Sequence, residues 1–106
     1  MRVNLKCAAA GLLAVGMVVP AMAQDSGAEI YKSKCARCHG DDGQSHTFEG
    51  RMTKAAVLTD PKVAATADAD LIAVVKDGKK KMPAFKKKLT DDQIAAVVAY
   101  VRTLGQ

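Results

Sequence analysis

The stretch CARCH, residues 35–39, decides how the rest of this chain is interpreted. It places Cys35 and Cys38 three residues apart and His39 directly after them. Two thiols at this spacing on a helical turn can each form a thioether with one vinyl group of a porphyrin. The adjacent imidazole then lies below the centre of the ring, where it can bind iron. The motif C-x-x-C-H therefore predicts that Cys35 and Cys38 attach a c-type haem covalently and that His39 is an axial iron ligand.

Paired cysteines at this spacing also occur in redox disulfides and in zinc sites. A thioredoxin-like disulfide belongs to a βαβ context, which this sequence does not show. A zinc site would use Cys35, Cys38, His39 and His46. Tetrahedral zinc sites usually draw their ligands from two separated pairs, and His39 is too close to Cys38 for all four to converge easily. The adjoining histidine favours haem.

The N-terminal segment predicts that the chain is exported. Residues 1–6 include the basic residues Arg2 and Lys6, an apolar run follows, and Ala21-Met22-Ala23 is an A-x-A cleavage site. We interpret residues 1–23 as a secretory signal peptide that is removed, leaving a domain at residues 24–106. An uncleaved anchor is disfavoured because the apolar run is short for a bilayer. Cys7 lies at the wrong end of the run for lipidation. No stable membrane insertion is expected after cleavage.

A second iron ligand is predicted in KKKMPAFKKK, residues 79–88. Methionine sulfur is a common axial ligand opposite histidine, and it raises the reduction potential of a haem. Pro83 biases Met82 toward an extended backbone and removes an amide donor after it. Most methionines only fill a core, but the lysines around Met82 argue against that role. Met52 lies 13 residues after His39 and has no comparable support. Met82 is therefore the predicted distal ligand.

Three helices are predicted. The first begins at Ser26, where S-x-x-E forms a capping box with Glu29, and runs through Cys38. The second covers residues 68–76, with Thr66 or Asp68 as its cap and Gly78 as its stop.

The third predicted helix has the clearest pattern. Thr90 and Gln93 form a capping box, and one apolar stripe follows it, made of Ile94, Val97, Val98, Val101 and Leu104. Gly105 is the predicted end. Between the first two helices, the polar stretch 40–65 indicates a turn at residues 40–43 and a short helix near residues 53–58. No strand pattern is present, so the predicted class is all-α.

The composition limits the size of the core and the kinds of partner. The full chain has 106 residues, no tryptophan, two phenylalanines, two tyrosines and a formal net charge of +5. Without Arg2 and Lys6, the domain at residues 24–106 has a net charge of +3. A domain this small often needs a cofactor to be stable. Nucleic acid binding is not expected, because the net charge is low and basic residues do not alternate with aromatic ones.

Six lysines flank the predicted methionine ligand: Lys79, Lys80, Lys81, Lys86, Lys87 and Lys88. A run of charge is usually no more than a solvated surface. If Met82 binds iron, however, these lysines lie near the rim of the haem. Positive charge there would steer the protein toward an acidic patch on a redox partner. Both interpretations stand at the level of the sequence.

Over residues 26–104, the chain resembles a small bacterial class I c-type cytochrome with one haem and histidine and methionine ligands. CARCHG and KMPAF match the haem-binding and methionine-ligand motifs of that family in order. Gly27 and Tyr31 match the family's residues where the first and last helices cross, and Val97 and Tyr100 match their partners. The resemblance implies a cytochrome c-like fold in which three main helices pack around one covalent haem c.

The resemblance also implies a function. The chain is expected to be a monomeric periplasmic carrier that passes one electron between redox partners through Fe(III)/Fe(II), and not an enzyme. The alternative is a haem-based gas sensor or peroxidase-type enzyme in which Met82 dissociates. It is disfavoured because the sequence supplies no distal acid–base residue. A zinc-binding interaction module is the third hypothesis.

The sequence departs from the family in two respects. Many relatives have a proline soon after the histidine ligand, and its carbonyl accepts a hydrogen bond from the imidazole. Residues 40–60 contain no proline, so the group that orients His39 is not predicted. The tryptophan that contacts a haem propionate in some members is also absent. Arg51, Lys54 or His46 are candidates for that contact, and each is equally compatible with a solvated loop.

Overall fold

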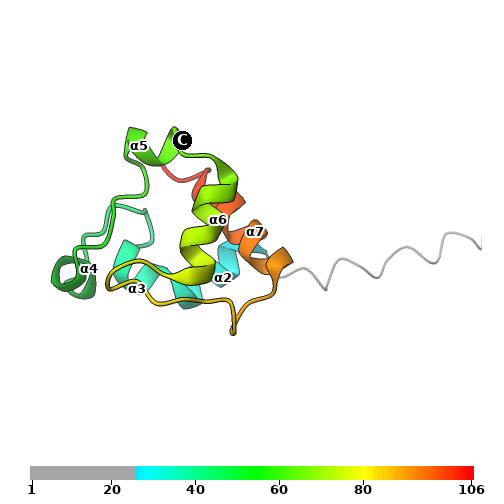
Figure 1. Ribbon diagram of the computed structural model, residues 1–106. Helices are drawn as coiled ribbons and strands as arrows, with labels where there is room; N and C mark the ends of the chain where they lie inside the picture. Colours follow the sequence, from blue (N-terminus) through cyan, green and yellow to red (C-terminus); the bar gives the residue numbers. More distant parts are fainter. Residues whose placement is uncertain (1–25) are drawn as a thin grey trace, which may run out of the picture.

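The computed structural model describes residues 26–106, which form helices joined by turns and loops (Figure 1). No strand occurs among these residues beyond one isolated bridge between Lys79 and Met82. The all-α prediction is confirmed. The predicted signal peptide, residues 1–23, lies outside the described part of the chain. The helices in order are α2 (Gly27–Lys34), α3 (Ala36–His39), α4 (Phe48–Thr53), α5 (Pro61–Ala64), α6 (Asp68–Asp77) and α7 (Asp91–Val101).

The first predicted helix is divided into α2 and α3. Ser26 caps α2 as predicted, because its hydroxyl accepts a hydrogen bond from the Glu29 amide at 3.1 Å. At Cys35 the backbone leaves regular helical geometry, with φ −117° and ψ −36°. The hydrogen bonds nevertheless continue through the break, from the Cys35 amide to Tyr31 and from the His39 amide to Cys35. The prediction of a single continuous helix is therefore wrong at one residue.

The predictions for α7 and α6 differ in their outcome. Thr90 and Gln93 form the complete capping box at the start of α7. The N-cap of α6 is Ala67, which has no side-chain cap, so the predicted cap by Thr66 or Asp68 is wrong. The Thr66 hydroxyl instead donates to the Lys62 carbonyl at 2.7 Å. None of the described helices has the length and apolar character needed to cross a membrane.

Two short helices organise the stretch between α3 and α6. A helix was expected near residues 53–58, but α4 lies earlier because Thr47 caps it, accepting a hydrogen bond from the Gly50 amide at 2.8 Å. Lys54 ends α4 with a left-handed backbone. The sequence did not predict α5, although Asp60 caps it and Pro61 occupies its first position, both of which are favoured at helix starts.

The crossing of α2 over α7 is the main helix contact of the domain (Figure 1). A side chain at Gly27 would overlap the backbone carbonyl of Ala96, so the two helices approach as closely as glycine permits. Tyr31 packs against Tyr100 with ring centroids 5.3 Å apart. The Tyr31 hydroxyl also donates to the Gly40 carbonyl at 2.6 Å, which ties the crossing to the loop after α3. The position of these residues agrees with the resemblance.

The core extends from this crossing to the segment between α6 and α7. The residues with the most buried apolar side chains are Ile30, Tyr31, Phe85, Leu89, Ile94, Val97 and Val98. The stripe predicted for the last helix is buried at Ile94, Val97 and Val98, whereas Val101 and Leu104 are partly buried against it. Phe85 and Leu89 belong to no helix, so the segment that carries Met82 is itself anchored in the core.

Arg102 links three helices just beyond the end of α7. Its guanidinium donates to the carbonyls of Val63 at 3.0 Å and Thr66 at 2.6 Å, and it pairs with Asp68 at 2.7 Å. The hydrogen bonds satisfy carbonyls in α5 and just after it. The ion pair joins Arg102 to Asp68, the first residue of α6. A planar guanidinium with several donors suits this role better than a lysine ammonium.

We predict that Gly27→Ala lowers the free energy of unfolding of the haem-loaded protein by about 1–3 kcal/mol, the usual cost of overpacking. The added methyl group would meet the Ala96 backbone, which belongs to α7 and cannot move away as a flexible side chain would. Denaturant unfolding measures the change. Lys32→Ala, on the exposed surface of α2, is the control and is expected to leave stability within about 0.5 kcal/mol. A Gly27→Ala protein as stable as the parent would contradict the proposed packing.

Candidate functional site

One cavity of about 860 Å³ lies between α3, α6 and the segment after α6. Its walls include the two cysteines, His39 and Met82, which come from positions up to 47 residues apart in the sequence. Apolar walls are supplied by residues such as Val74, Pro83 and Phe85. This volume lies within the range of about 300–1,000 Å³ that is typical of small-molecule and cofactor sites. The structure therefore brings all four residues predicted from the sequence to one site.

The break between α2 and α3 places the cysteine pair at this cavity. Cys35 and Cys38 are half-buried and are not joined in a disulfide. Burial raises the pKa of the Cys35 thiol to about 11, so the group is a neutral thiol at neutral pH. The two unpaired thiols on one wall could form the thioethers to a porphyrin, and the imidazole beside them could bind its iron.

The carbonyl of Ala56 orients His39. Nδ1 of the imidazole lies 2.9 Å from this oxygen, and because a carbonyl can only accept, Nδ1 carries the proton. Nε2 is then the nitrogen with a free lone pair, as an axial iron ligand needs. Burial lowers the pKa of His39 below its ordinary value, and the Ala56 hydrogen bond opposes this shift. Both the tautomer and the neutral state suit metal binding.

The loop from residue 40 to residue 47 is fitted closely around the end of α3. The Ser45 amide donates to the His39 carbonyl at 2.8 Å, and the Ser45 hydroxyl donates to the Ala56 carbonyl at 2.7 Å. The Thr47 hydroxyl lies 2.8 Å from the Arg37 carbonyl. A side chain at Gly50 would collide with the carbonyl of Cys38, so α4 packs directly on the backbone of α3.

Met82 is presented by a tight turn. The amide of Met82 donates to the Lys79 carbonyl at 2.9 Å, and the amide of Lys79 donates to the Met82 carbonyl at 3.0 Å. Lys80 within the turn has φ +53°, a conformation that residues other than glycine seldom adopt. Two reciprocal backbone bonds thus fix the backbone of Met82. Pro83, which follows it, is exposed.

The end of α6 supports this turn from the other side. The amides of Phe85 and Lys86 donate to the carbonyls of Val75 and Lys76. Gly78 ends α6 with φ +80°, and a methyl group there would lie 2.7 Å from the Met82 carbonyl oxygen. Gly78 was predicted only as a helix stop. Its second role is to let the backbone that carries Met82 pack against the end of α6.

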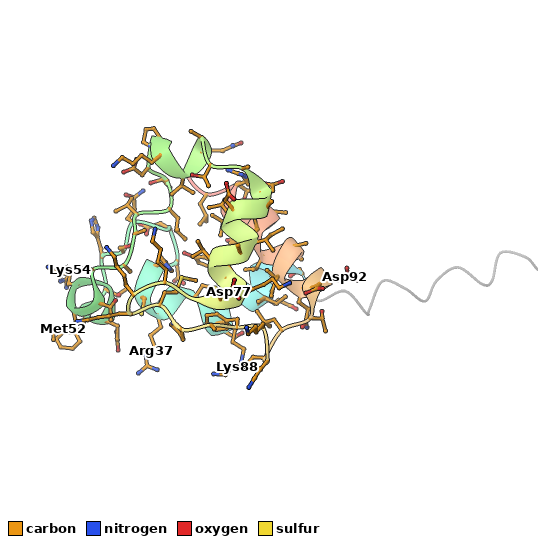
Figure 2. The ribbon with its side chains drawn as sticks, in the orientation of Figure 1. Arg37, Met52, Lys54, Asp77, Lys88 and Asp92 are labelled. Carbon is orange, nitrogen blue, oxygen red and sulfur yellow. The ribbon has the colours of Figure 1, made fainter. Side chains whose placement is uncertain are left out.

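Neither the alternative methionine ligand, Met52, nor the alternative zinc site is formed at the cavity. Met52 is 60% exposed on α4 and lies outside the cavity lining, and its side chain points outward from the molecule (Figure 2). His46 is exposed and also lies outside the lining. Within residues 26–106, no three histidine, cysteine, aspartate or glutamate side chains gather in a way that could hold a metal ion. The four residues of the zinc alternative are therefore not brought together.

The basic residues of the cavity come from more of the chain than the sequence predicted. Four of the six lysines around Met82 line it: Lys79, Lys80, Lys81 and Lys88. Lys86 and Lys87 do not, and Lys86 pairs with Asp77 at 3.6 Å. Three further basic residues line the cavity from other elements, namely Lys34, Arg37 and Lys54. Arg37 and Lys88 extend from the same side of the molecule (Figure 2). No aspartate or glutamate is among the described lining residues.

The structure adds three features of the site to what the sequence indicated. The carbonyl of Ala56 accepts hydrogen bonds from His39 and from Ser45, but a backbone carbonyl leaves no sequence signal, and the Ser45 hydroxyl was not distinguished from others in the loop. Lys54 alone among the three candidates for a haem propionate contact lines the cavity; Arg51 and His46 do not. Phe85 lies in the motif KMPAF, and the structure makes it both a core residue and a cavity wall.

Residues 22–101 match the protein family described as cytochrome c oxidase, cbb3-type, subunit III. Cytochrome c6 of Thermosynechococcus vestitus (strain NIES-2133 / IAM M-273 / BP-1) is 35% identical over 97 residues, covering 90% of this chain and 84% of the relative. Cytochrome c6 of Nostoc sp. (strain PCC 7120 / SAG 25.82 / UTEX 2576) is 39% identical over 84 residues, which cover 77% of this chain and 73% of the relative.

A solved structure of similar fold is the KustC0563 c-type cytochrome. It is 32% identical to this chain, with a TM-score of 0.71, and the match covers 77% of this chain and all of the other. Sequence, fold and cavity thus lead to the same family. The chain belongs to the small class I c-type cytochromes, electron-transfer proteins that carry one covalent haem c.

Proposed function

We propose that this cytochrome is an exported electron carrier in which Cys35 and Cys38 form the thioethers to the haem and His39 and Met82 are the axial ligands. The observation that carries the assignment is that these four side chains line one cavity of about 860 Å³. When bound, the haem iron stores one electron by alternating between Fe(III) and Fe(II). The side chains of this protein would hold the ring, supply the iron ligands and determine where a partner can approach.

His39 and Met82 have complementary tasks in this proposal. The Ala56 carbonyl holds the proton on Nδ1 of His39, so Nε2 would be the nitrogen that binds the iron. The reciprocal backbone bonds between Lys79 and Met82 hold Met82 in a fixed turn. This turn would help to keep the methionine sulfur bound in both oxidation states, so that little rearrangement would accompany electron transfer. Methionine opposite histidine also favours a raised reduction potential.

The same ligand set argues against an enzyme. With His39 and Met82 both bound, the metal would have no position open to a substrate or to dioxygen. Apart from His39, the described cavity walls contain no histidine, aspartate or glutamate that could act as a distal acid–base group. The gas sensor or peroxidase alternative requires Met82 to leave, and the turn that holds Met82 opposes this.

We further propose that the basic residues around the cavity form the docking surface for an acidic redox partner. This set, Lys34, Arg37, Lys54, Lys79, Lys80, Lys81 and Lys88, replaces the lysines predicted from the sequence, because Lys86 and Lys87 lie outside the cavity lining. Exposed charge of one sign raises the rate of encounter with a surface of the opposite sign. A partner bound there would lie next to the haem.

The periplasm is the proposed location. The support is the sequence of residues 1–23, with its basic start, short apolar run and A-x-A site. The domain that remains after cleavage is proposed to work as a soluble monomer.

We predict that Met82→Ala opens one axial position and lowers the reduction potential, because the thioether that favours the reduced state is lost. The visible spectrum should lose the band of methionine-ligated Fe(III), and the reduced variant should bind carbon monoxide. Met52→Ala is the matched control and should change neither property. Retained methionine ligation in Met82→Ala, or carbon monoxide binding by the parent protein at neutral pH, would reject the assignment of Met82.

Covalent attachment is tested in the exported protein. The haem should remain with the polypeptide after extraction with acidified acetone, and the mass should equal residues 24–106 plus one haem. The parent and a Cys35→Ala, Cys38→Ala variant are compared, since haem should become extractable from the variant. A mass that includes residues 1–23 would contradict cleavage, and extractable haem in the parent would contradict the thioethers.

For docking, we predict that Lys81→Glu, Lys88→Glu slows oxidation by an anionic inorganic complex such as ferricyanide on the order of 10-fold at low ionic strength. Oxidation by a cationic complex should not slow. The control, Lys32→Glu, Lys62→Glu, makes the same change in net charge at exposed positions outside the cavity lining. The difference should disappear at high salt, because exposed charges are screened. Equal rates for the two variants would remove the cavity lysines from the proposed docking surface.

A further inference from the structure

Ser45 has a combination of features that the proposed function leaves unexplained. It is only 8% exposed, and among residues 26–106 it is the buried residue with a polar side chain. Its backbone has φ +61°, a left-handed conformation that costs energy for any residue with a side chain. Its amide donates to the carbonyl of His39 at 2.8 Å. A glycine would fit this backbone with less strain, so the side chain is expected to have a purpose.

The hydroxyl of Ser45 shares its acceptor with His39. Ser45 Oγ lies 2.7 Å from the Ala56 carbonyl oxygen, and Nδ1 of His39 lies 2.9 Å from the same atom. Because a carbonyl oxygen has two lone pairs and no proton, both groups donate to it. The imidazole of the proposed axial ligand and a buried hydroxyl are thus coupled through one oxygen.

We propose that Ser45 is a positioning residue for His39 and that it raises the reduction potential of the bound haem by sharing the Ala56 carbonyl. The inference rests on the proposed function, since it takes His39 as the axial ligand. Nothing in the sequence motif around the cysteines indicates it.

The direction of the effect follows from the chemistry of the shared acceptor. A strong hydrogen bond from Nδ1–H makes the imidazole a more basic ligand, and hydrogen bonding beyond the ligand tunes a metal's potential. A second donor on the same oxygen draws on the same electron density, so the bond from Nδ1 becomes weaker. His39 then donates less to the iron, and the oxidised state is stabilised less. Removal of the Ser45 hydroxyl should therefore lower the potential.

The test uses two substitutions in the haem-loaded protein, Ser45→Ala and Ser45→Gly. Both remove the hydroxyl, but alanine keeps a side chain at positive φ whereas glycine relieves the strain. Ser45→Gly is therefore expected to fold even if Ser45→Ala is destabilised. The midpoint potential should shift to lower values in both variants. In proton NMR of the reduced protein, the Nδ1 proton of His39 should move downfield and exchange more slowly, because its hydrogen bond becomes stronger.

Thr66→Val is the control. It removes a hydroxyl that also donates to a backbone carbonyl at 2.7 Å, that of Lys62, in a part of the chain outside the cavity lining. The potential and the His39 signal should not change. A purely structural role for Ser45 would alter stability in the two variants without a common shift in potential.

The outcomes separate this inference from the function on which it rests. An unchanged or raised potential in both Ser45 variants, with axial ligation retained, would overturn the role of Ser45 alone. A shift in Ser45→Ala that is absent in Ser45→Gly would also overturn it, because backbone strain would then be the cause. A parent protein without covalent haem, or with methionine ligation retained in Met82→Ala, would overturn the proposed ligand set as well.

Discussion

The hydrogen bond from His39 to the Ala56 carbonyl fixes the ring nitrogen on which the whole site depends. With Nδ1 protonated and held at 2.9 Å, Nε2 is free to bind a metal. The acceptor is a backbone atom, so its position is set by the path of residues 54–58. That path is in turn fixed by α4, by the left-handed turn at Lys54 and by the amide of Leu58, which donates to Gly43. α4 and the loops on either side of it therefore set the position of this carbonyl.

The larger helices serve the other wall of the cavity. α2 and α7 cross at Gly27, and the core that they form extends to Phe85 and Leu89 in the segment after α6. Backbone bonds from Phe85 and Lys86 to the end of α6, together with the close approach at Gly78, hold the turn that carries Met82. The walls of the cavity on this side are thus held in place by the core and by the end of α6. A cofactor that fills this space adds the core that the side chains do not supply.

Charge at the site has a different origin from the ligand geometry. The lining lysines and Arg37 come from α2, α3, the end of α4 and the segment around Met82, and the described lining contains no aspartate or glutamate. Outside the lining, Glu49 pairs with Arg37 at 3.4 Å, and Asp77 and Asp91 pair with Lys86 and Lys76. Folding therefore gathers basic residues from several elements at the cavity. Exposed pairs such as these add little to stability.

The sequence by itself determined the features that depend on neighbouring residues. CARCH and KMPAF predicted Cys35, Cys38, His39 and Met82 as the haem-binding residues, and the structure places all four around one cavity. Apolar periodicity, with the caps of α2 and α7, placed α2, α6 and α7 to within a few residues. These signals act within one or two helical turns, so they are legible in the chain. Only the tertiary structure decided that Ala56 accepts from His39, that Ser45 shares this acceptor and which lysines line the cavity. These contacts join residues 11 or more positions apart, and their partners are backbone atoms or common surface residues. Their pairing depends on the path of the folded chain, which local sequence patterns do not specify.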